Sequence, residues 1–197
     1  MTDQIDDLVR FEGADLDLAE HDGELDRFVP AAHGLTPVFA GTDCWDGYHL
    51  GYVVEDWLYL DRVDIAVSPE AGGEAPIMFG HVPSRRTTTG PTWLTYRGLQ
   101  QRCDFTGSFL LGRGNTGAPL TPRGYCYASV VELAFEAGRL VNASDATAEM
   151  CRLRTRWEDR PRLSADVPDL EFFARAREQS KAYSGFFGSR RALSNPV

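Results

Sequence analysis

Tyr-Cys-Tyr-Ala-Ser-Val-Val-Glu-Leu-Ala-Phe, residues 125–135, is the stretch of the sequence that decides the fold class. Its odd positions carry mostly large side chains, whereas its even positions carry small ones and one carboxylate, Glu132. An alternation with a period of two is typical of a β-strand with one buried face. The stretch therefore predicts a strand that buries Phe135 and turns Glu132 to the opposite face.

The same alternation recurs along the chain and predicts a mainly β protein. Long strands are expected over residues 59–67, 105–111 and 151–157, and shorter ones near residues 8–12, 38–40, 48–54, 77–81, 93–97 and 139–141. A helix that begins at Ser144 competes with the strand at 151–157, but the alternating arginines there favour the strand. Loops rich in Gly and Pro separate the strands at residues 69–76, 83–91 and 112–122.

These elements predict one domain, an antiparallel β-barrel or curved β-sandwich over residues 1–165, and the length of 197 residues suits a single domain. A C-terminal helix over residues 166–185 is expected to pack on it. Asp166 can cap the start of this helix, and Gly185 can end it. Residues 186–197 are predicted to be a tail.

Charge is distributed unevenly along the chain. The net charge is −9, but residues 1–76 carry −15 and residues 77–197 carry +6. The acidic total argues against nucleic acid as a partner, and we expect the two segments to pair, within one chain or across a homodimer. The acidic amino terminus and the lack of a long apolar stretch predict neither a signal peptide nor a membrane span. A cytoplasmic protein with reduced cysteines is therefore expected.

Two patterns that could hold a cofactor are weak. Gly112–Gly117 has the spacing GxGxxG, but Pro119 and Pro122 follow it where a dinucleotide site needs a helix. The four histidines are 12 or more residues apart, with no spacing typical of metal ligands. The sequence therefore predicts neither a metal nor a nucleotide cofactor.

Four phrases of the chain resemble a family of small bacterial β-rich proteins that is defined by a sequence pattern and not by an activity. The pattern is CWxGY…LYL…FxGxL…GYxxxYE…FExG, and the matching segments are Asp43–Tyr48, Asp56–Leu60, Phe105–Phe109 and Gly124–Leu140. The resemblance covers residues 8–142 and implies a mainly β domain. Ala128 stands where the family has a glutamate, which implies that an ancestral role of that position is lost or exchanged here.

Polar residues on faces that should be buried are the candidates for a functional site. Asp61 follows the alternation of the apolar residues in 59–67, and a buried carboxylate must be paired or have a raised pKa. His81 follows the apolar alternation of residues 77–81 in the same way. His49 lies between two glycines, which leave space around its ring for close packing or for a ligand. A structural role is favoured over catalysis for both residues: a structural hydrogen bond for Asp61, and a place in the core or at the rim of a pocket for His81.

These residues suggest general acid/base chemistry, because no serine or cysteine lies in a setting that would activate it as a nucleophile. His49 or His81 is the expected base, and Asp61 or Asp43 is expected to orient it. The expected hydrogen-bond donors to a developing enolate are Tyr48, Tyr52 and Tyr127. The expected substrate-binding residues are Trp45, Tyr52, Tyr59, Arg85, Tyr125 and Glu132.

The leading functional hypothesis is a cofactor-independent enzyme, a cyclase, isomerase or dehydratase, that acts on an apolar or polyketide-like small molecule inside the barrel. One alternative is a binding or immunity-type protein whose acidic first third engages a basic partner, and another is a ligand carrier without catalysis. An enclosed cavity of ~300–1,000 Å³ lined by these polar groups favours the enzyme, whereas a filled interior argues against it.

Overall fold

The computed structural model describes residues 7–23, 25, 28–41, 44–69, 74–87, 90–116 and 123–158, with side chains as far as residue 155. Residues 1–153 make up one compact unit and residues 154–197 a second. All the strands described below belong to the first unit. The helix predicted at 166–185 and the tail predicted at 186–197 lie outside the described residues, and so does Asp43.

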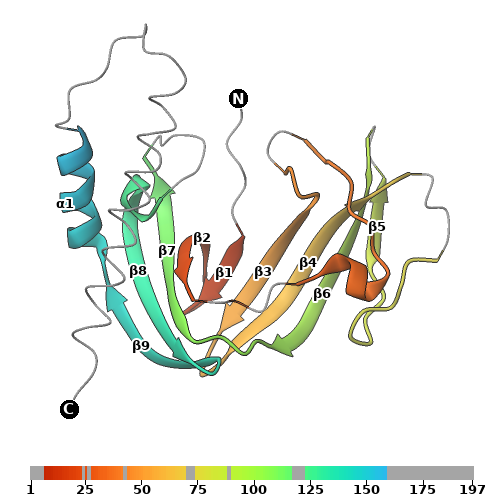
Figure 1. Cartoon of the computed structure of the whole chain (residues 1–197), viewed down its shortest axis with the longest axis horizontal. Helices are drawn as coiled ribbons and strands as arrows, with labels where there is room; N and C mark the ends of the chain where they lie inside the picture. The colour runs from red at the N-terminus through yellow and green to blue at the C-terminus, as the bar shows by residue number, and fades with distance from the viewer. Residues whose placement is uncertain are drawn as a thin grey trace, which may run out of the picture. The chain divides into compact units, whose positions relative to one another are not determined.

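Nine strands form a single sheet in the described residues, which confirms the prediction of a mainly β fold (Figure 1). They are β1 (Leu8–Phe11), β2 (Ala14–Asp22), β3 (Tyr48–Val54), β4 (Leu58–Val67), β5 (Ser84–Thr87), β6 (Thr92–Arg102), β7 (Gly107–Asn115), β8 (Tyr127–Glu136) and β9 (Arg139–Asp145). Their order is β5-β6-β4-β3-β1-β2-β7-β8-β9. The sheet is mixed and not purely antiparallel, because β1 runs parallel to β3. It curves strongly, as predicted, but β5 and β9 remain its edges, so it does not close into a barrel.

The curvature brings the turns at one end of the sheet together. The turn between β8 and β9 contacts the turn between β3 and β4: Leu58 N–H donates to the Gly138 carbonyl at 2.8 Å, and Leu140 N–H donates to the Asp56 carbonyl at 3.0 Å. The guanidinium carbon of Arg102 lies 3.3 Å from the centre of the Trp57 ring beside them. Strands that are distant in the order of the sheet are thus held together at this end.

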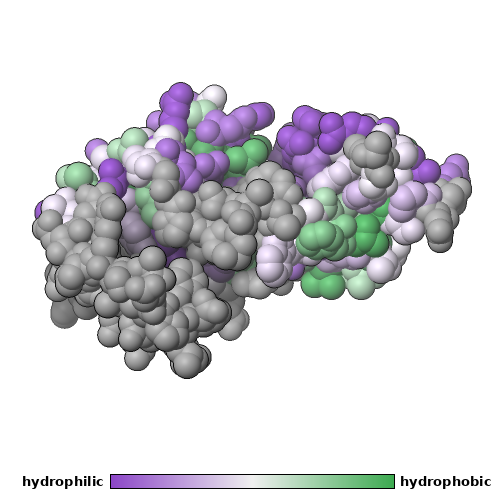
Figure 2. All heavy atoms as spheres, turned by 90° about the horizontal axis from the view of Figure 1, so that it is seen from above, coloured by the Kyte–Doolittle hydropathy of each residue, from purple (hydrophilic) through white to green (hydrophobic). Residues whose placement is uncertain are grey.

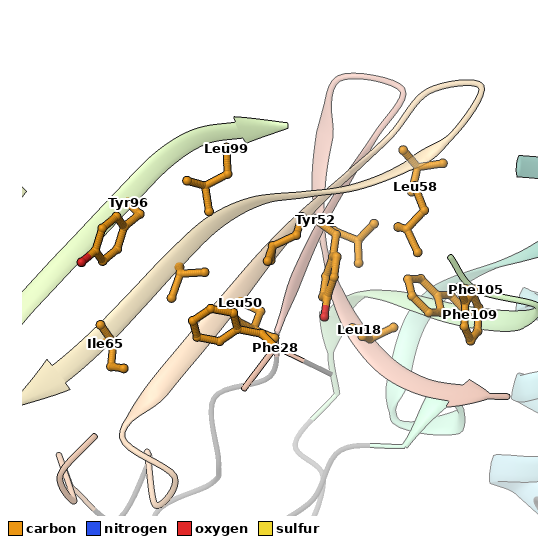
Figure 3. Close-up of a cluster of buried hydrophobic side chains, with 14 of the residues drawn as sticks. Leu18, Phe28, Leu50, Tyr52, Leu58, Ile65, Tyr96, Leu99, Phe105 and Phe109 are labelled. Carbon is orange, nitrogen blue, oxygen red and sulfur yellow. The ribbon is translucent and has the colours of Figure 1, made fainter. Parts of the chain in front are cut away.

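The concave face of the sheet is filled by a hydrophobic core (Figure 3). Its buried side chains come from most of the strands and include Tyr52, Ile65, Tyr96 and Phe109. The Tyr96 hydroxyl satisfies its polarity by donating to the Pro76 carbonyl at 2.8 Å. Apolar side chains therefore occupy the side on which the sequence suggested a ligand cavity, and the pocket described below lies on the opposite face.

Most predicted strands coincide with observed ones, but four short segments differ. Residues 38–40, predicted as a strand, form none, although Val38 N–H donates to the Ala66 carbonyl at 2.9 Å. Residues 14–22 form β2, which the prediction lacked, and β5 lies in a segment predicted to be a loop. Residues 77–81, predicted as a strand, contain a tight turn instead. There, Phe79 and Gly80 adopt positive φ values of 50° and 81°, and Met78 and His81 form a bridge on either side of them.

The strand predicted over residues 151–157 is wrong, because α1 (Thr147–Glu158) occupies this segment. The Asp145 carboxylate accepts a hydrogen bond from Thr147 N–H at 2.8 Å, which satisfies a backbone donor at the start of the helix. The Thr147 hydroxyl accepts a second one from the backbone of β8 at 3.0 Å. Ala146 and Met150 are both buried at helical spacing, and this burial outweighs the alternation of the arginines.

Candidate functional site

The candidate site begins at an irregularity in β4. Tyr52 on β3 is the partner of Leu60 and Gly51 is the partner of Arg62, so Asp61 is an extra residue between them. The pairing of β4 with β6 shifts at the same place. Such a β-bulge bends the strand and re-aims a side chain. Asp61 therefore lies with Arg62 on the outer face, and the prediction that it shares the apolar face of residues 63–67 is wrong.

A pocket of about 250 Å³ lies over this bulge and is lined by residues of β1, β2, β3, β4 and β6. Its charged lining residues are Arg10, Asp15, Asp61, Arg62, Asp64 and Arg97, and its other lining residues are Leu8, His49, Leu50, Gly51, Tyr52 and Val53. Gly51 carries no side chain, and a Cβ there would lie 3.0 Å from the Cβ of Arg62. The missing side chain keeps this part of the pocket open, and a ligand in it meets charged groups on several sides.

Four of these charged side chains are paired with each other. Arg10 contacts Asp15 through Nε at 2.8 Å and Nη2 at 3.3 Å, and this hydrogen bonding lowers the pKa of the Asp15 carboxyl. Arg62 Nε lies 2.5 Å from Asp64 Oδ2. The other oxygen of Asp64 accepts a hydrogen bond from the Thr95 hydroxyl at 2.6 Å. The two pairs therefore compensate their own charges.

Arg97 and Asp61 carry the remaining two charges. Within the described residues neither has a hydrogen bond or an ion pair. Arg97 is exposed and is the ladder partner of Arg62, whereas Asp61 is half-buried. After Asp15, the Asp61 carboxylate is a further group that raises the pKa of Arg10. Among the described residues the pocket thus presents a cation, Arg97, and an anion, Asp61, that form no ion pair, although Arg10 is an electrostatic neighbour of Asp61.

His49, one of the two bases expected from the sequence, lines the same pocket. Its ring lies parallel to that of Trp93 on β6, with an angle of 9° and ring centres 6.0 Å apart. This contact orients the imidazole on the outer face. The structure therefore brings together His49 and Asp61 of the residues predicted for the site. Tyr52 also lines the pocket, but its ring is buried in the core beside Phe109 on the other face of the sheet.

The other residues predicted for the site lie elsewhere. They are His81, Tyr48, Tyr127, Trp45, Tyr59, Arg85, Tyr125 and Glu132, none of which lines this pocket. His81 exchanges two backbone hydrogen bonds with Met78 in the tight turn, and Tyr48 packs edge-on against Phe28. Trp45 is 65% exposed. On the face of the molecule that Figure 2 shows, apolar side chains (green) form patches at the surface among more hydrophilic ones (purple).

A second group of ionisable side chains lies at β2, β7 and β8. Glu20 and Glu132 are both ladder partners of Leu110, so their carboxyls share one face of the sheet. Arg123 Nη1 lies 2.6 Å from Glu20 Oε1. Burial nevertheless raises the pKa of Glu20 to about 7, and burial raises that of Tyr125 to about 12. This group can hold a proton near neutral pH, and it ties the chain before the 3-10 turn η2 (Gly124–Cys126) to β2.

Sequence reasoning missed Arg97, Glu20 and Arg123. An arginine or glutamate on a strand resembles a solvated side chain until its neighbours on other strands are known. One signal for Arg97 was present, because Gly98 interrupts an otherwise regular strand, and glycine within a strand often marks a bulge. Nothing comparable marks Glu20, whose burial depends on strands distant in the sequence.

No group of three or more His, Cys, Asp or Glu side chains among the described residues is placed to hold a metal ion. The helices of this part of the chain also lack the length and apolar character needed to cross a membrane. Comparison of the sequence and structure with protein-family models, curated proteins and solved structures finds no match. The resemblance to the bacterial β-rich family stays a prediction, and the pocket is the feature of the molecule from which a function can be inferred.

Proposed function

We propose that the protein binds a small anionic molecule in the outer-face pocket and exchanges a proton with it through His49. The observation that carries the proposal is Arg97, whose guanidinium lines the pocket without an ion pair among the described residues. A guanidinium binds a carboxylate or phosphate group through two parallel hydrogen bonds. An imidazole beside that group can accept or donate a proton near neutral pH.

The size and the wall of the pocket favour a small, polar ligand. Its volume of about 250 Å³ lies below the ~300–1,000 Å³ that is usual for drug-sized ligands. Half of its lining residues are charged. These properties favour a small polar metabolite, in place of the apolar or polyketide-like substrate that the sequence suggested. The basic partner and the homodimer expected from the charge distribution stay predictions.

Calorimetric titration of the full chain with acetate, succinate and inorganic phosphate tests the proposal. We expect at least one of these probes to bind, and Arg97→Gln to weaken its affinity ~10-fold or more, because a charged hydrogen bond contributes ~1.5–3 kcal/mol. Arg113→Gln is the matched control, since Arg113 is exposed on β7 and does not line the pocket. Equal losses in the two variants would show that only the net charge matters and would contradict the proposed site.

The proton exchange is measured in the same titrations. If His49 gains or releases a proton on binding, the heat of binding depends on the ionisation enthalpy of the buffer. His49→Gln is expected to bind the probe and to remove this dependence. A buffer dependence that survives the substitution would assign the proton to another group.

A further inference from the structure

We infer that the ligand of this pocket is a zwitterion, an aliphatic α-amino acid, and not a simple anion. The inference rests on the proposed function, because it assumes that Arg97 holds an acidic group. What it adds is a second recognition element, Asp61, which the bulge in β4 delivers to the same pocket. Within the described residues this carboxylate has neither an ion pair nor a hydrogen bond.

The two charges are close enough to engage one small molecule. Arg62 follows Asp61 in the chain and is the ladder partner of Arg97. Asp61 and Arg97 therefore lie on adjacent strands, β4 and β6, and flank Arg62. Adjacent strands are ~4.8 Å apart. Side chains on two such strands can reach the ammonium and the carboxylate that one carbon atom of the ligand carries.

Charge also lowers the affinity for the simpler ligands. A monocarboxylate held by Arg97 would bring its negative charge toward Asp61, which repels it and is left uncompensated. A simple amine held by Asp61 would leave Arg97 uncompensated in the same way. Because Asp61 is half-buried, a second negative charge brought beside it lowers the affinity of a simple anion, so the pocket favours a molecule that carries both groups.

The remaining wall suits an aliphatic side chain. Leu8 and Val53 line the pocket on neighbouring strands, and Gly51 between them contributes no side chain of its own. Leu8 is 38% exposed, so contact with an aliphatic group would remove apolar surface from water. Charged groups at one part of the pocket and an apolar wall at another match the two ends of an amino acid such as leucine.

Three probes with one carbon skeleton test the inference on the full chain. They are L-leucine, 4-methylpentanoate, which lacks the amine, and 3-methylbutylamine, which lacks the carboxylate. We expect leucine to bind at least ~10-fold more tightly than either analogue, as a charged hydrogen bond provides. Asp61→Asn is expected to lower the affinity for leucine to that for 4-methylpentanoate. Asp104→Asn, an exposed aspartate outside the pocket, serves as the control and is expected to leave all three affinities unchanged.

The outcomes separate this inference from the proposed function. Equal affinities for leucine and 4-methylpentanoate, both lost in Arg97→Gln, would overturn the zwitterion and leave the anion site standing. Binding of none of the probes, acetate, succinate and phosphate included, would overturn both. Preference for leucine that persists in Asp61→Asn would overturn the role of Asp61. Melting temperatures of the variants distinguish a lost contact from a lost fold.

Discussion

Glu20 shows how the burial of one carboxyl couples the stability of the protein to pH. Its side chain is 11% exposed, and burial raises its pKa from 4.5 to about 7 against the influence of Arg123. Between these two values the folded chain keeps a proton that the unfolded chain has released. The free energy of unfolding therefore falls as the pH rises through this window, by about 3 kcal/mol for a shift of this size.

Glu20→Gln is expected to remove this contribution to the pH dependence. The neutral amide carries no ionisation penalty, so the variant should lose less stability than the parent chain between pH 4.5 and pH 7. Arg123 loses its charged partner but is 32% exposed, so water can solvate it. Urea unfolding at several pH values measures the effect. Glu74→Gln, at an exposed position, is the control, and parallel stability curves for parent and Glu20→Gln would contradict the prediction.

Asp61 illustrates what could be predicted of the site at the level of single residues. The sequence singled it out as a polar residue in an apolar strand, and singled out His49 between two glycines, and both line the pocket. It placed Asp61 on the wrong face, because the period of two was carried unbroken through residues 59–67, whereas the bulge shifts the alternation at Asp61. A one-residue shift is invisible in a single strand and is defined only by its partners.

At the scale of elements, the turn between β8 and β9 depends on close backbone approach. Gly138 has a φ of +81°, and a Cβ at this position would lie 2.0 Å from the Cys103 carbonyl oxygen. Gly138→Ala is therefore expected to lower the free energy of unfolding by about 2 kcal/mol or more, from the backbone conformation and the collision together. Thermal and urea unfolding measure this change.

Gly80→Ala separates the two causes. Gly80 also has a φ of +81°, but a Cβ there would meet nothing within 4 Å. Its substitution should therefore cost only the conformational part, about 1 kcal/mol. If both substitutions cost the same, the collision with the Cys103 carbonyl is relieved without cost, and the close backbone approach does not constrain this position.

The elements themselves were predictable where one face is buried along the whole strand. β3 matches its predicted range, and β4 and β9 start within a residue of theirs. The helix after β9 was not predictable in this way, because its arginines alternate as in a strand, whereas Ala146 and Met150 have the spacing of residues on one face of a helix. The sequence held both patterns, and packing of Met150 decided between them. β2 was missed because a bulge at residue 19 interrupts its short alternation.

At the scale of the whole molecule, β1 and β2 join two halves of the sheet. One half contains β3 to β6 and the other β7 to β9. These two strands form the central seam of the sheet, in which Val9 on β1 is fully buried. Val9→Ala is expected to cost about 2 kcal/mol, as removal of buried methyl groups does. Because the seam is shared, amide hydrogen exchange should accelerate together in β6 and β8.

Val141→Ala provides the comparison, since Val141 is 50% exposed on the edge strand β9. It is expected to change stability by no more than ~0.5 kcal/mol. Acceleration of exchange in only one half of the sheet on Val9→Ala would show that the halves unfold independently, and the seam would then not couple them.

The mainly β class and the curvature were predictable from alternation and turn residues, but the order of the strands was not. Alternation reports which face of a strand is buried and carries no information about its neighbour. The parallel pairing of β1 with β3 in particular has no local signature, because residues 8–11 look the same in either direction. The pocket depends on that order, since Leu8 and Arg10 reach it only through this pairing.

The central position of the first hairpin also gives the uneven charge of the chain a role during synthesis. β1 and β2 leave the ribosome before the other strands of the sheet, yet β2 must wait for β7, which begins at residue 107. Until then the hairpin has open edges, and open edges invite aggregation. Glu12, Asp15, Asp17, Glu20 and Asp22 lie in or beside it. Negative charges at such positions oppose the pairing of open edges with those of other copies. The acidic first third is therefore suited to keep nascent hairpins from aggregating until the partner strand has been made.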